Sequence, residues 1–182
     1  MNDPAERIYE RLLVVRAQAG DEAAFTELVE RYSPKLRYFL RKLLASADGA
    51  EDALQDVWLD AFRHLPRLSD PEALTAWLYR IARDRAYGRL RKSRQLEPFE
   101  EARLPDDAEG EGEFTAEDAA RIHAALDRLP PEQREVLVLR FVEDLSYEQI
   151  ASVVGCQLGT VRSRIHYGKQ ALRRTLEKDQ PQ

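Results

Sequence analysis

Hydrogen-bond donors crowd one short stretch near the C-terminus of the chain. Apolar residues recur at helical spacing between residues 158 and 172, and six donors fall on or beside the opposite face: Thr160, Arg162, Ser163, Arg164, His166 and Lys169. Such groups bind phosphate oxygens and base edges, and Arg162 or Arg164 suits a bidentate contact to guanine. The pattern predicts a nucleic-acid interface; the alternative is a basic face that only meets solvent.

A second basic stretch, residues 77–94, mixes arginines with aromatic residues. Five side chains follow i, i+3, i+4 spacing and share one face of the predicted helix: Arg80, Arg83, Tyr87, Arg91 and Arg94. Cations can follow a phosphate backbone while an aromatic ring stacks on an unpaired base. We interpret this face as a second nucleic-acid surface. The alternative is a solvated arginine face, with Trp77 and Ile81 in the core beneath it.

Three aspartates form an acidic ridge on another predicted helix. Asp52, Asp56 and Asp60 are four residues apart, beside an apolar stripe that includes Trp58. Like charges at this spacing destabilise an isolated helix, so something else should favour them. A basic partner protein is one explanation, and a solvated face explains the spacing equally well.

The charge of the chain is distributed unevenly. The 182 residues carry a net charge of −5, yet residues 94–115 alone hold eight acidic and two basic residues, a net charge of −6. Residues 77–94 have a net charge of +6, and residues 160–178 have a net charge of +5. Because ionic interactions in salt act over ~10 Å, the local charge decides what a surface binds. The overall negative charge therefore does not exclude a nucleic-acid partner.

Helical periodicity runs through most of the chain, and no segment alternates in the manner of a half-buried strand. Ile8, Leu12 and Val15 make the first predicted stripe, and a later one ends at Phe141. Residues 94–115 are rich in acids, Pro and Gly and have too little apolar surface to fold. The sequence predicts an all-α protein with two small helical domains, residues 1–93 and 116–178, joined by a flexible acidic linker at 94–115.

Local rules predict a helix-turn-helix in the second domain. Ser146 followed by Gln149 fits a capping box, which starts a short helix. Gly155 supplies the positive φ of a tight turn, and the next helix begins near Leu158. The donors between Thr160 and Lys169 then lie at the start of the second helix, the part of such a motif that enters the major groove.

Catalytic chemistry has no visible site. His64, His123 and His166 lie in separate segments, and Cys156 is the only cysteine. We therefore expect no catalytic residue, metal or cofactor, and no enzyme. No stretch approaches the ~20 apolar residues of a membrane span, and the N-terminus lacks the apolar core of a secretory signal. We expect a cytoplasmic protein without membrane insertion.

Four segments, in this order, resemble the bacterial RNA polymerase sigma factors of the extracytoplasmic-function (ECF) group, group IV. The resemblance covers most of the chain. It implies a sigma region 2-like helical bundle followed by a sigma region 4-like helix-turn-helix domain. The segments are LVVRAQAGDEAAFTELVERY, AEDALQDVWLDAF, TAWLYRIAR and LPPEQREVLVLRFVEDLSYEQIASVVGCQLGTVRSRIH.

The resemblance implies protein partners. Four residues sit where the family faces the clamp helices of the largest polymerase subunit: Asp52, Gln55, Asp56 and Trp58. The flap of the second-largest subunit is a further expected contact. Family members are often held by an anti-sigma factor, and we expect one here. The acidic linker matches a segment that passes through the polymerase toward the RNA exit path.

The resemblance also divides the DNA contacts between two promoter elements. The loop Arg67–Pro71 and the helix from Trp77 onward sit where the family melts and reads the −10 element, with these candidate residues: Arg67, Arg80, Arg83, Asp84, Tyr87 and Arg91. The −35 element falls to the donors near the C-terminus: Thr160, Arg162, Ser163, Arg164, His166 and Lys169. The implied function is to bind core RNA polymerase and direct it to promoters that carry both elements.

Four positions depart from the usual family pattern. Asn is common where this chain has Asp84, Asp where it has Gly88, Ser or a similar cap where it has Gln157, and a basic residue where it has Tyr167. The Asp84 carboxylate would repel phosphates unless an arginine pairs with it.

An alternative function is a homodimeric helix-turn-helix regulator that binds duplex operators. It would share the second domain, but the aromatic–basic helix and the acidic ridge fit it less well. As a sigma factor, the free chain is expected to be monomeric.

Overall fold

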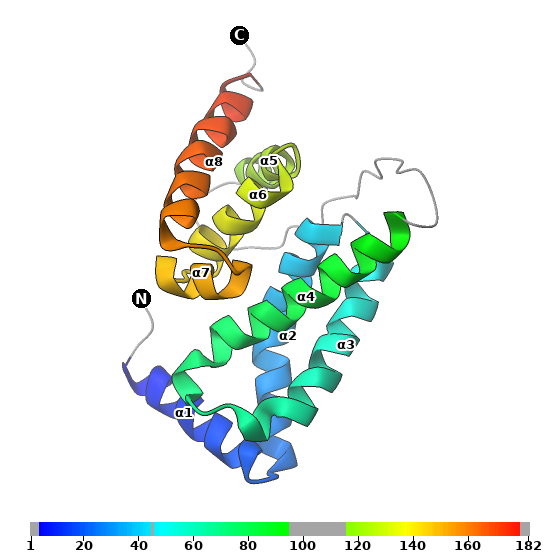
Figure 1. Cartoon of the computed structure of the whole chain (residues 1–182), viewed down its shortest axis with the longest axis vertical. Helices are drawn as coiled ribbons and strands as arrows, with labels where there is room; N and C mark the ends of the chain where they lie inside the picture. Colours follow the sequence, from blue (N-terminus) through cyan, green and yellow to red (C-terminus); the bar gives the residue numbers. More distant parts are fainter. Residues whose placement is uncertain (1–3, 45, 95–115, 179–182) are drawn as a thin grey trace. The chain divides into compact units, whose positions relative to one another are not determined.

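The computed structural model describes residues 4–44, 46–94 and 116–178, and all regular structure in these ranges is helical (Figure 1). The chain divides into two compact units between residues 99 and 100. This confirms the prediction of an all-α protein built from two helical domains. Except for Arg94, the predicted linker lies outside the described residues.

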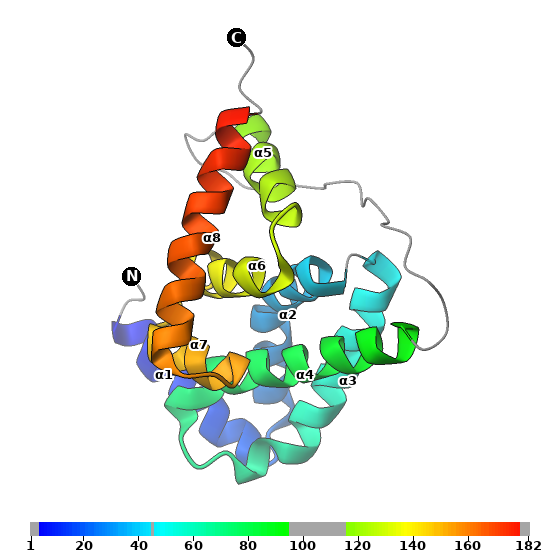
Figure 2. The same cartoon turned by 45° about the horizontal axis from the view of Figure 1, so that its top comes forward.

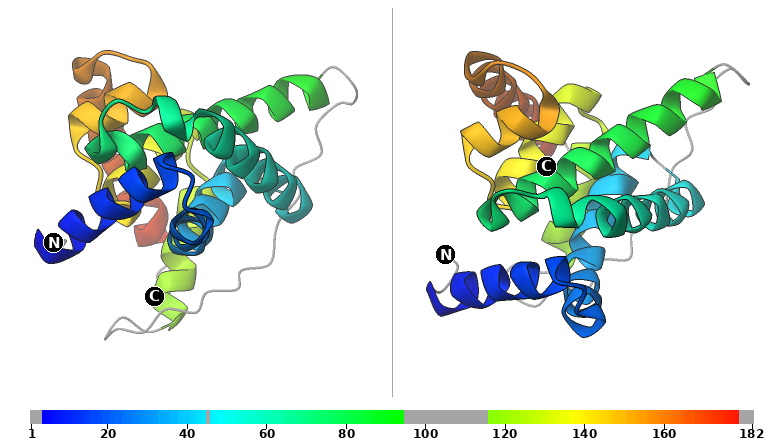
Figure 3. Two further views of the ribbon diagram at one scale, coloured as in Figure 1. Left: turned by 90° about the horizontal axis from the view of Figure 1, so that it is seen from below. Right: turned by 60° about the horizontal axis from the view of Figure 1, so that its bottom comes forward.

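The first unit is a bundle of four helices. It contains α1 (Pro4–Gln18), α2 (Glu22–Leu44), α3 (Ala47–His64), two short 3₁₀ turns, η1 (Leu65–Arg67) and η2 (Pro71–Ala73), and α4 (Leu74–Arg94). Helix α2 packs against each of the other three, and α3 packs against α4. Figure 3 shows α3 and α4 side by side, connected by the loop that carries η1 and η2.

Small residues bring α3 and α4 close together in the core of this unit. The buried positions of α3 include Ala50, Ala53 and Ala61, and those of α4 include Ala82 and Ala86. Larger side chains of α2 pack against this pair of helices. For example, the Phe39 ring meets the fully buried Tyr79 ring edge to face, with the ring centroids 5.2 Å apart.

Helix α1 corrects the first predicted stripe. Ile8, Leu12 and Val15 are all at least half exposed, whereas Leu13 and Val14 are fully buried. The reason is that polar residues share the packed face with these two. Glu10 bonds to the Tyr32 hydroxyl, and Gln18 donates to backbone carbonyls of the loop after α3. These bonds allow polar side chains to pack inward, so hydropathy alone selects the wrong face.

Helix α4 corrects the placement of Trp77 and Ile81, which are half-buried and do not belong to the core. The core positions are Leu78, Tyr79 and Ala82, one residue further along the helix. Since one residue turns an α-helix by about 100°, this shift moves the buried side of α4 away from Trp77 and Ile81, while Arg80 and Arg91 stay exposed on the opposite side.

The second unit is a smaller helical domain. It contains α5 (Ala116–Asp127), α6 (Pro131–Leu137) continued by a π-helical turn η3 (Val138–Val142), α7 (Tyr147–Val154) and α8 (Leu158–Lys178). Helix α8 packs against α5, α6 and α7 (Figure 2). Its Gly168 lies against α6, where an added Cβ would come within 3.1 Å of Leu137 Cδ1, so a side chain there would push the two helices apart.

The helix-turn-helix is confirmed in its local detail. Gln149 N donates to Ser146 Oγ at 3.1 Å, and Ser146 N donates back to Gln149 Oε1 at 2.8 Å, which completes the capping box. Gly155 ends α7 with φ of 67° in the left-handed region, and α8 begins at Leu158. Ile150, Val153, Val161 and Ile165 are buried between the two helices and their neighbours. The outer face of α8 is thereby fixed.

Candidate nucleic-acid interface

Five of the six predicted donors on α8 are exposed. They are Thr160, Arg162, Ser163, His166 and Lys169. His166 is held by neighbours on its own helix, since its Nε2 lies 3.0 Å from Gln170 Nε2 and its ring meets Tyr167 edge to face. The Lys169 ammonium lies 5.7 Å from the centroid of the Phe141 ring. The early turns of α8 thus present hydroxyl, guanidinium and imidazole groups together.

The sixth donor, Arg164, lies differently. Its side chain is only 23% exposed, and its Nη2 lies 2.7 Å from Glu132 Oε2 in α6. The guanidinium therefore joins α8 to α6 in the structure. Sequence spacing cannot reveal this, because the two residues are 32 positions apart.

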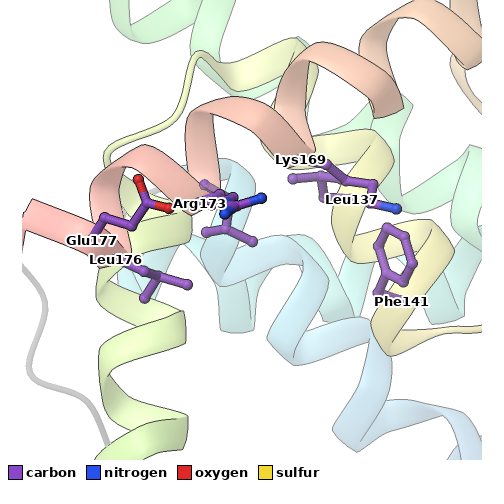
Figure 4. A pocket seen from close by; sticks show the side chains of 7 residues that line it. Leu137, Phe141, Lys169, Arg173, Leu176 and Glu177 are labelled. Atoms are coloured by element: carbon purple, nitrogen blue, oxygen red, sulfur yellow. Dashed lines mark hydrogen bonds and ion pairs between the residues drawn. The ribbon is translucent and has the colours of Figure 1, made fainter.

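A shallow apolar groove lies beside the donors in the second unit. Figure 4 shows Leu137 and Phe141 on one side and side chains of α8 on the other. The groove encloses about 350 Å³, and its lining is Leu137, Phe141, Lys169, Leu172, Arg173, Leu176 and Glu177. Phe141 is 58% exposed here, so its predicted place in a core stripe is wrong. The π-helical turn at residues 138–142 inserts an extra residue per turn and rotates this ring outward.

Helix α4 presents one outward stripe of charged and aromatic residues. Arg80, Asp84 and Arg91 are exposed, and Tyr87 is partly exposed with the Arg83 guanidinium 4.5 Å from its ring centroid. At about 100° per residue, positions 80, 84, 87 and 91 fall on the side of α4 opposite its buried face. The structure thus brings together the α4 residues that the sequence assigned to the −10 element. Among the described residues, Asp84 has no ion pair with an arginine.

Two further arginines of α4, Arg85 and Arg89, pair with the acidic ridge of α3. Arg89 Nη2 lies 2.7 Å from Asp56 Oδ2, and its Nη1 lies 3.5 Å from Asp52 Oδ2. Arg85 Nε donates to Asp60 Oδ2 at 2.6 Å, and this bond raises the pKa of the guanidinium. All three aspartates therefore have cationic partners within the chain. The two explanations drawn from the sequence, a basic partner protein and a solvated face, did not include ion pairs with a neighbouring helix.

A groove of about 460 Å³ runs between α3 and α4 beside these ion pairs. Asp56, Asp60, Asp84, Arg85 and Arg89 are among its lining residues, together with Ile81, Gly88 and Lys92. A Cβ on Gly88 would meet only the tip of Arg91, at 4.0 Å. The absence of a side chain at position 88 therefore leaves the groove open.

The face of α3 that the sequence assigned to a protein partner combines polar and apolar groups. Gln55 and Asp52 are exposed, whereas Trp58 is half-buried and its Nε1 donates to Ser33 Oγ at 3.0 Å. One turn further along, Leu59 is 54% exposed and Phe62 is 64% exposed. These two apolar residues were missed by the sequence reasoning, although their spacing from Gln55 of four and seven residues was the available signal.

The loop between α3 and α4 carries the remaining predicted residue, Arg67. Arg67 is exposed, while Leu65 beside it is buried. Gln18 of α1 holds this loop through two hydrogen bonds, because its Nε2 donates to Leu65 O at 3.0 Å and to Leu68 O at 2.7 Å. Helix α1 therefore fixes the backbone of this loop, and the Arg67 side chain is exposed.

Comparison with known proteins identifies both units. Residues 28–95 match the model of Sigma-70 region 2, and residues 119–172 match that of Sigma-70 region 4. The chain is 33% identical over 178 residues to the RNA polymerase sigma-H factor of Pseudomonas aeruginosa, and the aligned region covers 91% of this chain and 92% of that protein. The chain belongs to the ECF sigma factors. As a sigma factor, it acts in promoter-directed initiation of transcription by RNA polymerase.

Two further comparisons support the ECF assignment. The sigma factor is 36% identical over 157 residues to the ECF RNA polymerase sigma factor RpoE of Cereibacter sphaeroides, which covers 84% of this chain and 86% of that one. It resembles the sigma factor RpoE in the co-crystal structure with the anti-sigma factor NepR from Bartonella quintana, with a TM-score of 0.71 and 29% identity over 86% of this chain and 98% of that one. Both resemblances extend over most of the chain.

Other kinds of site are not found in the described part of this sigma factor. Among residues 4–44, 46–94 and 116–178, no group of three His, Cys, Asp or Glu side chains could hold a metal ion. Within the same ranges, no helix is long and apolar enough to cross a membrane.

Proposed function

We propose that the early turns of α8 read the −35 element through Thr160, Arg162, Ser163 and His166, with Lys169 on a phosphate. The observation that carries this is that these donors are exposed together at the start of the second helix of the motif. Such a helix reads base edges with its first turns and meets the backbone with its flanks. Arg164 contributes differently, because it reaches DNA only when it leaves Glu132.

The −10 element is read by α4 and by the loop before it. The outward stripe of Arg80, Tyr87 and Arg91 offers cations for phosphates and an aromatic ring for an unpaired base. The Arg83 guanidinium packs on the Tyr87 ring, and the exposed Arg67 on the loop binds a phosphate of the unpaired DNA strand. Asp84 in the middle of this stripe is an acceptor, which suits a base that presents an exocyclic amino group and opposes a nearby phosphate.

Core polymerase binds the exposed face of α3. Asp52, Gln55 and Asp56 form the polar part of this surface, and Trp58 supports it from below through its bond to Ser33. Leu59 and Phe62 add the apolar part, since burying apolar surface on binding is favourable and phenylalanine is enriched at protein interfaces. The partner is the pair of clamp helices of the largest subunit.

The groove of the second unit takes an apolar segment from the flap of the second-largest polymerase subunit. Its leucines and Phe141 offer apolar surface, and Arg173 at its edge suits an acidic group beside that segment. Phe141→Ala should weaken binding of an isolated flap fragment, measured by fluorescence anisotropy. Val142→Ala, which trims an exposed neighbour outside the groove lining, is the matched control.

The sigma factor has no catalytic activity of its own, and the polymerase performs the chemistry. It works in the cytoplasm, is a monomer when free, and is restrained by an anti-sigma factor that covers its polymerase-facing surfaces. In the similar structure, the sigma factor RpoE is in complex with an anti-sigma factor, NepR. Capture from the native cell should recover this inhibitor in stoichiometric amount. Recovery of polymerase subunits alone would contradict this part of the proposal.

Run-off transcription tests the main proposal. Core polymerase with this protein should initiate at specific start sites, and core alone should not. Arg162→Ala should reduce discrimination between the −35 element and a mutated element, because a bidentate contact contributes ~1–3 kcal/mol of discrimination. Arg174→Ala is the control, since it removes the same charge from an exposed site later in α8. Equal loss of discrimination in both variants would refute base reading by Arg162.

A further inference from the structure

Gln18 connects α1 to the loop between α3 and α4. Its Nε2 donates to the carbonyl oxygens of Leu65 at 3.0 Å and Leu68 at 2.7 Å, and the amide is partly buried. Both N–H groups of a single amide nitrogen are thus used on two carbonyls that are three residues apart. Pro66 and Arg67 lie between these two fixed points and are exposed.

Other contacts complete the attachment of the loop. The Leu65 side chain is buried, and Leu68 N donates to Leu65 O at 3.0 Å, which closes the turn. At the far end, Asp70 Oδ1 accepts from Glu72 N at 2.9 Å, and Arg11 of α1 pairs with Glu72. Helix α1 therefore holds the loop at both ends, through the Gln18 amide on the loop backbone and through Arg11 on the Glu72 side chain.

We propose that Gln18 is a positioning residue for capture of an unpaired −10 base by this loop. The inference rests on the proposed function, in which the loop and α4 read the −10 element. A loop that is ordered before binding loses less conformational entropy when it meets DNA. If the bound shape becomes a minor population, the apparent affinity falls by the same factor. Gln18 keeps the bound shape dominant without touching DNA itself.

The chemistry at position 18 restricts which side chains can replace the amide. Methionine has a similar length but no donor, so Gln18→Met would leave the outer carbonyl, Leu68 O, without this partner. A lysine ammonium carries three donors on a longer chain, so Gln18→Lys can reach both carbonyls. Both variants lose the amide, but only Gln18→Met loses the hydrogen-bond donors, so comparing the two isolates the effect of the donors.

The test uses holoenzyme and a forked promoter whose −10 strand is unpaired. We expect Gln18→Met to lower its affinity about tenfold, as loss of two ordinary hydrogen bonds implies, and to reduce discrimination against a substituted −10 base. Affinity for core polymerase should stay unchanged, and Gln18→Lys should stay within about twofold of the parent. Unchanged −10 discrimination in Gln18→Met would overturn the proposal. An equal loss of core affinity would overturn it as well, because Gln18 would then support the whole unit.

Arg67→Ala separates this inference from the proposed function. If Arg67→Ala weakens −10 binding and Gln18→Met does not, only the role of Gln18 is wrong. If Arg67→Ala leaves −10 binding unchanged, the loop does not read this element, and both statements fail. Thermal unfolding of each free variant shows whether it folds, and Gln18→Lys remains a valid test of the donors if Gln18→Met does not fold.

Discussion

The ion pair between Arg164 and Glu132 predicts that removing an acid strengthens DNA binding. In Glu132→Gln, the Arg164 guanidinium loses its 2.7 Å carboxylate partner and becomes available to a phosphate of the −35 duplex. The pair is partly exposed, and such pairs are worth ~0.2–1 kcal/mol, so the affinity should rise by up to about fivefold. One additional phosphate contact should also steepen the salt dependence, adding about 0.9 to the slope of log K against log salt.

The assay is binding of a −35 duplex to holoenzyme over a series of salt concentrations. Asp144→Asn is the matched control, because it removes the same charge from an exposed acid of the same unit that pairs with Arg140 at 3.4 Å. The effect of Glu132→Gln should disappear in an Arg164→Ala background. An equal rise in that background, or in the control, would refute release of Arg164 as the cause.

Three further outcomes follow from single contacts. Burial and the bond to Glu10 raise the pKa of Tyr32. The stability that its neutral hydroxyl contributes is therefore complete below pH ~10, the pKa of an unfolded tyrosine, and is lost as the pH rises above that value. In Tyr32→Phe, the free energy of unfolding measured with denaturant should fall less over this alkaline range. Gln157→Ser should raise the free energy of unfolding by ~0.5–1 kcal/mol, because serine caps α8 and glutamine does not, and an unchanged chemical midpoint would contradict this. Phe62→Ser should weaken core binding about tenfold or more in a competition assay, whereas Val142→Ser, which changes an exposed apolar residue outside both proposed polymerase surfaces, should leave core binding unchanged.

Features set by neighbouring residues were predictable from the sequence. The capping box of Ser146 and Gln149 and the left-handed Gly155 follow rules that operate within a few positions, and both are confirmed. Helical period and the charge pattern likewise indicated two helical domains. The order of the motifs then pointed to the sigma family.

Features set by distant partners were not predictable. The exposed stripe of α1 was assigned to the core because the polar residues on the packed side, Glu10 and Gln18, find partners 22 and at least 47 residues away. The position of Arg164 in the sequence matches that of a DNA-reading residue, but the fold brings Glu132 next to its guanidinium. Phe141 was predicted to point into the core on the assumption of a regular 3.6-residue period. The π-helical turn at residues 138–142 breaks that period, and Phe141 is exposed.

The ion pairs between α3 and α4 link two properties of this sigma factor that could otherwise vary independently. Arg89 contacts Asp52 and Asp56, so a substitution at either aspartate changes the surroundings of a cation on α4, the helix that we propose reads the −10 element. If α3 binds core polymerase as proposed, a substitution at Asp52 or Asp56 that adapts the chain to a different polymerase will also change its promoter preference. Chimaeras that exchange α3 between related sigma factors will inherit altered promoter behaviour unless Arg85 and Arg89 are transplanted with it.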